Sequence, residues 1–208
     1  MEYYGQQRPE RRRRQGLLAL LLAGSALISA TGATMSLALF TSTVSANNNS
    51  FTAGTIVLGV APSPIILTSA SMMPGDNVPA GVPGQAVTVS NTGSGQLRYA
   101  IAGTSTDADG KHLNTQLLIT VAQPDGNAGS SCALMTGTVL FSAVVPTAGV
   151  NMVGNPAQGN QAGDRVLNAS TSETLCFKAS LPIGTANAYQ GAASTYTFNF
   201  SAEQTANN

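Results

Sequence analysis

Thr195-Tyr-Thr-Phe-Asn-Phe-Ser201, near the end of this 208-residue chain, alternates aromatic and polar side chains. In an extended chain the three aromatic rings fall on one face, and Thr197 and Asn199 fall on the other. A period of two is typical of an antiparallel strand that buries one face and exposes the other. This stretch therefore predicts β-structure and a core made by one face of a sheet.

Similar strand signals recur upstream of this stretch. Short runs rich in Val, Ile, Thr, Leu, Phe and Tyr alternate with clusters of Gly, Pro, Asn and Asp, and no apolar stripe has helical spacing. Met73-Pro-Gly-Asp76 and Asn91-Thr-Gly-Ser-Gly95 carry the residues that tight turns require. We expect an all-β, jelly-roll-like antiparallel β-sandwich of about eight strands. The expected strands are 52–60, 65–69, 85–91, 96–103, 117–122, 138–142, 173–181 and 194–202.

Three segments do not fit the strand pattern. Residues 123–131 and 146–164 have loop composition, and the second is long enough for a functional or mobile loop. Residues 109–116 are compatible with a short helical turn. The chain shows no internal repeat and no second folded domain.

Charge is scarce and unevenly placed. Five of the nine basic residues and two of the nine acidic residues lie in the first fourteen positions. The remainder therefore carries four basic and seven acidic residues in an otherwise polar, uncharged chain. A phosphate-binding surface needs clustered Lys and Arg, so nucleic acid is not an expected partner.

The N-terminus has the layout of an export signal. A basic block, residues 11–14, precedes an apolar run, residues 17–28, and then small residues. Ser36-Leu-Ala38 predicts signal peptidase cleavage after Ala38, and Val44-Ser-Ala46 is a poorer alternative. The expected parts are a signal peptide (1–38), an extended N-terminal segment (39–50) and a β-sandwich domain (51–208).

An uncleaved membrane anchor is the alternative for the hydrophobic segment. Residues 17–40 carry no charge and are long enough to cross a bilayer as a helix, although small polar residues dilute the run. Arg13 and Arg14 suggest a twin-arginine signal, but the rest of that motif is missing. The membrane is thus an expected partner only if this segment is retained.

The only two cysteines are an even pair. In an exported chain Cys132 and Cys176 predict a disulfide, since extracellular compartments are oxidising. The alternative is two buried free thiols.

Few residues fit catalytic chemistry or metal binding. His112 is the single histidine, and the chain has neither a zinc-protease motif nor a nucleophile elbow nor a phosphate-binding loop. Ser105-Thr-Asp-Ala-Asp-Gly110 resembles the start of a calcium loop over 105–116, but Gln116 stands where a bidentate Glu is needed. An Asp-Gly turn is the simpler interpretation. No cofactor, metal or catalytic residue is expected.

Several motifs together resemble the camelysin/TasA family of exported bacterial proteins, whose signals are typically cut by a SipW-type peptidase. They appear in the family's order and cover most of the exported part of the chain. One departure is Thr41-Ser-Thr43 after Phe40, where relatives often have Ser-Asp. The motifs are Ala38-Leu-Phe40, Asn49-Ser-Phe-Thr-Ala-Gly-Thr-Ile-Val-Leu58, Met73-Pro-Gly-Asp76, Val87-Thr-Val-Ser-Asn-Thr-Gly93, Leu97-Arg-Tyr99, Leu175-Cys-Phe177, Leu181-Pro182, Tyr189-Gln-Gly191 and Tyr196-Thr-Phe-Asn-Phe-Ser-Ala-Glu-Gln204.

The resemblance implies a jelly-roll sandwich at the cell surface or in the extracellular matrix. It also implies assembly into biofilm fibres, in which the N-terminal segment of one subunit completes a sheet of the next. Residues 39–50 suit that role: they are β-prone and uncharged, and Leu39, Phe40 and Val44 offer side chains to a groove. We expect a non-enzymatic protein whose main partner is itself, with signal peptidase as a transient partner.

The sequence is also compatible with two other functions. Metalloendopeptidase activity has been attributed to part of the family, and here it would have to involve His112. A monomeric cell-surface adhesin would use the 146–164 loop. The extended segment 39–50 can also be a simple leader between the cleavage site and the domain.

Overall fold

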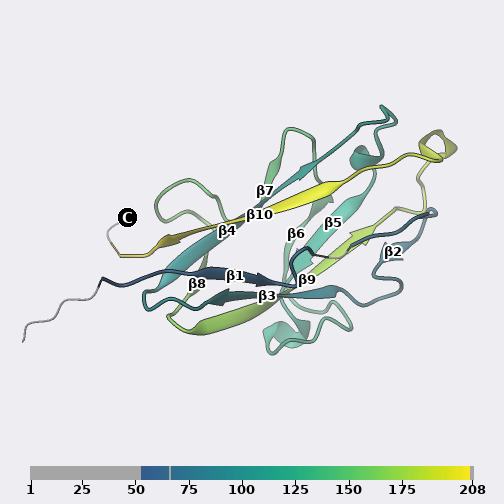
Figure 1. Cartoon of the computed structure of the whole chain (residues 1–208). Coiled ribbons are helices and arrows are strands. Elements are labelled where there is room, and N and C mark those ends of the chain that lie inside the picture. Colours follow the sequence, from purple (N-terminus) through teal and green to yellow (C-terminus); the bar gives the residue numbers. More distant parts are fainter. Residues whose placement is uncertain (1–52, 66, 207–208) are drawn as a thin grey trace, which may run out of the picture. The chain divides into compact units, whose positions relative to one another are not determined.

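A computed structural model describes residues 53–65 and 67–206, and this part of the chain is a two-sheet β-structure (Figure 1). It contains ten strands and three single-turn 3-10 helices, and every strand pair is antiparallel. The expected signal peptide and segment 39–50 lie outside the described residues. The strands are β1 (Leu58–Ala61), β2 (Asn77–Val78), β3 (Gln85–Asn91), β4 (Leu97–Ser105), β5 (Leu118–Ala122), β6 (Val139–Val144), β7 (Val150–Val153), β8 (Arg165–Leu167), β9 (Thr171–Ser180) and β10 (Tyr196–Gln204). The helices are η1 (Leu113–Thr115), η2 (Asp125–Asn127) and η3 (Asn187–Tyr189).

The larger sheet has six strands in the order β1-β3-β9-β5-β6, and the short β2 also pairs with β9. β9 is its central strand: β3 pairs with it from Gln85↔Phe177 to Asn91↔Thr171, and β5 pairs with its other side. The smaller sheet has four strands in the order β10-β4-β7, with β8 also paired to β4. The β4–β7 pairing has a register shift between Ile101 and Ala102.

One hydrophobic core is shared by the two sheets. On β4 every second residue faces this core, and Leu97, Tyr99 and Ile101 have almost no exposed surface. The ring of Phe177 on β9 meets Phe198 of β10 edge-on, with ring centroids 5.3 Å apart. The sheets are therefore packed face to face, as the alternating sequence predicts. The other fully buried apolar residues include Val87, Val89, Ile119, Val121, Val145 and Leu175.

The predicted turns follow the chemistry of their sequences. At residues 73–76 the Asp76 amide donates to the Met73 carbonyl over 2.9 Å, and Gly75 takes a positive φ of 98°. In the next turn the Asn91 side chain accepts from the Gly93 amide and donates to the Gly95 carbonyl. The short helical turn expected within 109–116 is η1.

One predicted strand is absent and another is shorter than expected. Residues 65 and 67–69 form no strand: Pro62 and Pro64 just upstream lack the N–H that a ladder needs, and Ile65 and Leu67 instead pack against the core. The first strand, expected over 52–60, is the four-residue β1.

Three strands were missed. β7 lies inside the predicted 146–164 loop, where the turn residues on both sides mask a four-residue alternation. β2 and β8 have two and three residues, too few to show a period. The structure therefore has ten strands where about eight were expected. No helix in the described ranges is long and apolar enough to cross a membrane.

Candidate functional site

Among the described strands, β10 is the outer strand of the smaller sheet, and none of them pairs with its second side. Within residues 53–206, β10 pairs only with β4, from Tyr196↔Ser105 to Gln204↔Leu97. In such an antiparallel pair every second residue points its N–H and C=O away from the partner. On the side of β10 away from β4, called here the open edge, the alternate residues Tyr196, Phe198, Phe200 and Ala202 therefore present their backbone donors and acceptors.

The open edge lacks the devices that usually prevent strand addition. Its pairing with β4 is continuous, without a bulge, and the strand contains no proline and no lysine. Glu203 is its only charged residue, and it lies at the end of the strand. Long, regular and uncharged edges are the ones most ready to accept another strand.

The core-facing side of β10 is also incompletely covered. Phe198 and Phe200 are only partly buried although both rings contact Phe177, whereas Tyr99 and Ile101 on the neighbouring β4 have lost nearly all their exposed surface. The core is thus sealed at β4 and still open to solvent at β10. A further strand beside β10 would cover apolar ring surface and gain about 25 cal/mol for each Å² buried.

The other outer strands are weaker candidates. β1 has four residues, β8 has three, and the pairing of β7 with β4 contains a register shift. β6 has six residues, and its pairing with β5 is interrupted between Val121 and Ala122. Length and regularity therefore single out β10 among the described strands.

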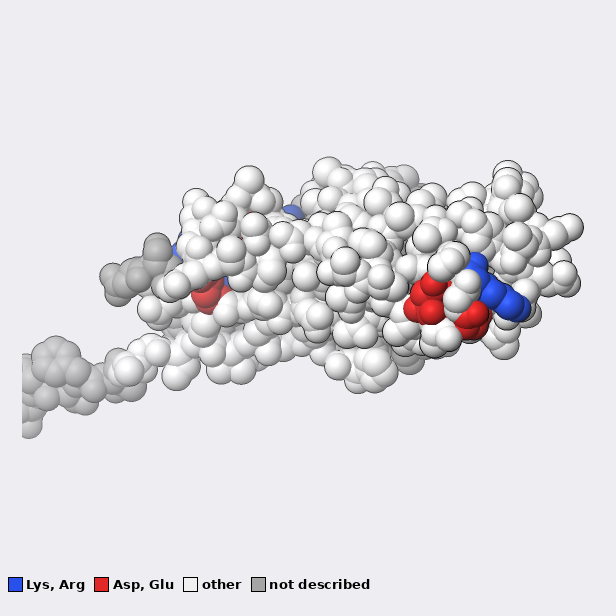
Figure 2. Space-filling model, turned by 90° about the horizontal axis from the view of Figure 1, so that it is seen from above, with Lys and Arg blue, Asp and Glu red and all other residues white. Residues whose placement is uncertain are grey.

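The surface carries little charge that could attract or repel a charged partner. Figure 2 shows a few charged spots separated by wide uncharged areas. Arg98 pairs with Glu203, Arg165 pairs with Glu173, and Lys178 donates to the Val82 carbonyl. Contacts made at this surface must therefore depend mainly on backbone hydrogen bonds and apolar packing.

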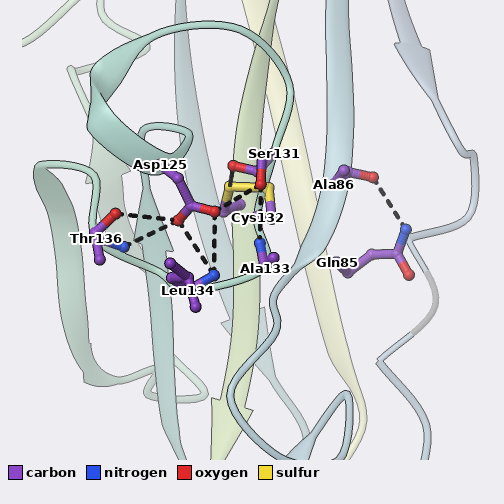
Figure 3. Close-up of a disulfide and its surroundings, with 9 residues drawn as sticks. Gln85, Ala86, Asp125, Ser131, Cys132, Ala133, Leu134 and Thr136 are labelled. Carbon is purple, nitrogen blue, oxygen red and sulfur yellow. Dashed lines mark hydrogen bonds between the residues drawn. A yellow bond between two sulfur atoms is a disulfide. The ribbon is translucent and has the colours of Figure 1, made fainter.

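The predicted disulfide is present. Cys132 and Cys176 are joined, with Cα atoms 5.5 Å apart, so the loop before β6 is tied to the central strand β9. Beside it, in Figure 3, the Asp125 carboxylate accepts from the Ser131 hydroxyl, the Leu134 amide and the Thr136 amide and hydroxyl. These hydrogen bonds lower the pKa of Asp125 to about 2.

The segment with the calcium-like pattern is an Asp-Gly turn. Gly110, with φ of 66°, donates to the Asp107 carbonyl over 3.2 Å. The Asp107 carboxylate holds the backbone and ring of His112, and Asp109 accepts from the Lys111 and Ala193 amides. Both carboxylates are thus engaged in shaping the turn.

His112, the residue on which a peptidase would depend, lies on the surface. Its side chain is two-thirds exposed and pairs with Asp107. No group of three or more His, Cys, Asp or Glu residues within the described ranges is placed to hold a metal ion. The geometry therefore gives no support to a zinc centre at this position.

The predicted assembly residues lie outside the described ranges. These are the cleavage position Ala38 and the segment residues Leu39, Phe40 and Val44, so the structure does not test them. The sequence showed that β10 is a half-buried strand, but it did not show that this strand is at an edge. Edge position depends on which strands pair, and that depends on long-range contacts that alternation does not encode.

No protein-family model matches this chain, and no curated protein sequence matches it.

Proposed function

We propose that this chain is an exported, non-enzymatic structural protein that assembles into extracellular fibres by donor-strand exchange. Residues 39–50 of one copy, the donor segment, add as a strand to the open edge of β10 in the next copy. The proposal includes cleavage after Ala38, a jelly-roll arrangement of the two sheets, membership of the camelysin/TasA group, and a location in the matrix or at the cell surface.

The observation that carries the proposal is the state of β10. It is a nine-residue outer strand that pairs, among the described strands, with β4 alone, and its aromatic residues are only partly buried. An added strand would pair with the backbone groups that Tyr196, Phe198, Phe200 and Ala202 turn away from β4, and it would cover the rings in one step. Both gains are independent of charge, in keeping with the weakly charged surface.

The donor segment has the matching chemistry. Residues 39–46 carry no charge, and Leu39, Phe40 and Val44 supply apolar side chains. The polar Asn47-Asn-Asn49 run follows and serves as a tether to the folded domain. From Leu39 to Ala53 an extended chain reaches up to about 50 Å, far enough to leave its own subunit.

A contact of this kind propagates. The donor segment and the open edge are different surfaces, so each copy that donates still has an unoccupied edge. Repetition produces a head-to-tail filament instead of a closed dimer. Fibre formation is therefore the expected outcome of the same two features.

Deletion with rescue tests the proposal directly. Protein that begins at Leu39 is compared with protein that begins at Asn47, by negative-stain electron microscopy and size-exclusion chromatography. We expect filaments from the first and a folded monomer from the second. A synthetic peptide of residues 39–50 should bind the shortened protein with one-to-one stoichiometry.

The controls distinguish strand addition from nonspecific hydrophobic association. A peptide with Leu39→Lys and Phe40→Lys should bind much more weakly, because two charges would have to lie against the partly buried rings of Phe198 and Phe200. Filaments that persist without residues 39–46 would rule out the donor segment. A protein beginning at Leu39 that stays monomeric at high concentration would rule out self-assembly.

A further inference from the structure

The start of β1 and the end of β10 lie at the same end of the described domain (Figure 1). Leu58 pairs with Asn91, a short turn leads from Asn91 to Leu97, and Leu97 pairs with Gln204. This end, called here the entry end, is therefore where the N-terminal part of the chain joins the domain. β10 begins at Tyr196 at the opposite end, called here the far end, and runs back to the entry end.

The tether is short compared with the reach of the whole N-terminal segment. Six residues, 47–52, separate the uncharged part of the donor segment from Ala53. Ala53 lies next to the entry end, since the Thr55 carbonyl accepts from the Gly95 amide over 2.9 Å. An extended chain of six residues spans at most about 20 Å. The donating domain must therefore stay close to the end of the acceptor where the donor segment finishes, and its entry end faces that place.

The direction of the added strand decides which ends meet. A donor segment antiparallel to β10 runs from the entry end of the acceptor to its far end. The entry end of the donating domain then faces the far end of the acceptor, and both domains point the same way. A parallel donor segment would finish at the entry end and would bring two entry ends together.

Only the antiparallel direction lets the contact repeat. In the parallel arrangement one entry end would have to face two neighbours, the copy that donates to it and the copy that receives its own segment. Two copies could still exchange segments, but the product would be a closed dimer. A fibre therefore requires antiparallel addition, which is also the direction of every strand pair in the described domain.

The far end carries the two most exposed large apolar residues of the described chain. β9 starts opposite the end of β3 and finishes at the far end, so the loop that follows it lies there. Ile183 in this loop is 82% exposed, and Met73 is 67% exposed. The two loops are joined, because the Gly75 amide donates to the Leu181 carbonyl over 2.7 Å, and a Cβ on Gly75 would lie 3.0 Å from Ile183 Cδ1. Met73 and Ile183 are called here the far-end patch.

The entry end has exposed apolar residues as well. Val57, just before β1, is about half exposed, and its carbonyl accepts from the Thr92 amide in the turn after β3. Val166 on β8 is also about half exposed and lies opposite Arg98, the second residue of β4. Apolar surface is therefore present on both ends that antiparallel addition brings together.

We propose that the far-end patch of one copy docks against the entry end of the next copy, beside Val57. This inference rests on donor-strand exchange as the proposed function, and it adds a strand direction and a second contact between neighbouring copies. The occupant is a second copy of this chain because the short tether brings an entry end to this position. Contact with it removes apolar side chains from water.

Charge placed on the far-end patch tests the second contact. In protein that begins at Leu39, Met73→Lys with Ile183→Lys should raise the lowest concentration that gives filaments by about tenfold or more, because apolar burial is lost. The shortened protein that begins at Asn47, carrying the same two changes, should bind the peptide of residues 39–50 as well as the unaltered shortened protein does. Val82→Lys with Leu134→Lys is the matched control, since both residues are exposed and apolar but lie near the disulfide. This control should assemble normally.

The outcomes distinguish this inference from the proposed function. An unchanged filament threshold in the far-end variant, or an equal rise in the control, would overturn the docking contact and leave the donor segment in place. If the unaltered shortened protein does not bind the peptide, donor-strand exchange itself is wrong, and this inference falls with it.

Cross-linking tests the direction of the strand. Cys132 and Cys176 are joined and buried, so an introduced cysteine is the reactive thiol of the described domain. Filaments of Val57→Cys with Ile183→Cys, treated with a flexible bis-maleimide, should give a ladder of covalent multimers on a denaturing gel. Val57→Cys alone should stay monomeric on the same gel. Covalent dimers from Val57→Cys alone, or no ladder from the double variant, would overturn the antiparallel arrangement.

Discussion

Glu173 is a single carboxylate that links the two sheets. It lies on β9 in the larger sheet and accepts from the Tyr99 hydroxyl on β4 over 2.8 Å. It also accepts from Arg165 Nε on β8, with 2.8 Å to each carboxylate oxygen. Burial raises the pKa of Tyr99 well above its ordinary value, and the nearby Glu173 carboxylate adds to the rise. Both effects favour the neutral phenol, which is the form that donates to Glu173.

Removing the negative charge of Glu173 should lower the free energy of unfolding more than removing the Tyr99 hydroxyl. Glu173→Gln leaves Arg165 partly buried without a carboxylate, and we expect a loss of about 2–3 kcal/mol in the free energy of unfolding. Tyr99→Phe removes one hydrogen bond but keeps the ion pair, with an expected loss of about 1 kcal/mol. Urea unfolding followed by circular dichroism measures both. The reverse order of the two losses would show that the ion pair contributes little.

The lowered pKa of Asp125 predicts that the stability of the protein falls in acid. Its pKa in the folded protein is about 2, against about 4 in an unfolded chain, so folding favours the ionised form. The stabilisation is complete above the unfolded value and is lost as the pH falls towards 2. Asp125→Asn should lower the melting temperature at about pH 7, and its difference from the unaltered protein should narrow as the pH falls. Thermal unfolding at a series of pH values checks this, and a constant difference would contradict it.

At the scale of elements, the disulfide fastens a loop to the centre of the larger sheet. Cys132 is 44 residues from Cys176, and its carbonyl also accepts from the Gly84 amide just before β3. Closing a loop of this length restricts the unfolded chain, and the chain-entropy estimate of the stabilisation is about 4 kcal/mol. The double variant Cys132→Ala with Cys176→Ala should lose about that much stability in urea unfolding. An equally stable variant would show that the Asp125 hydrogen bonds alone hold the loop.

The strands differ in how well the sequence alone predicts them. β10 and β3 have enough alternating residues to show a period of two. The disulfide could also be predicted, because the chain has two cysteines and each has one possible partner. β7 has four residues between turn signals. It is a strand because it pairs with β4, which is distant in the sequence. Ile65 and Leu67 lie in a β-prone stretch, but they pack against the core without belonging to a strand. Local pattern reports burial, whereas pairing and edge position depend on contacts between distant segments.

At the scale of the whole molecule, the low charge makes a prediction about assembly conditions. Residues 39–46 carry no charge, and on β10 only Glu203 does, where it is already paired with Arg98. Salt screens interactions between charges, so it should have little effect on the strength of the proposed contact. We expect light scattering to show similar assembly rates from about 0.05 to about 0.5 M sodium chloride. A steep fall with salt would point to a charged contact in place of strand addition.

The position of the contact is tested by placing charge on the open edge. Thr197 and Asn199 are exposed on the outer face of β10, so Thr197→Lys with Asn199→Lys leaves the core side untouched. Lysines on an edge strand disfavour strand addition, because the incoming chain would have to pack beside and desolvate the ammonium groups. We expect this variant to stay folded and to form no filaments in electron microscopy. Asn151→Lys adds a charge to the exposed face of β7, the opposite outer strand of the same sheet, and should assemble normally. Filaments from the β10 variant together with none from the β7 variant would move the acceptor from β10 to β7.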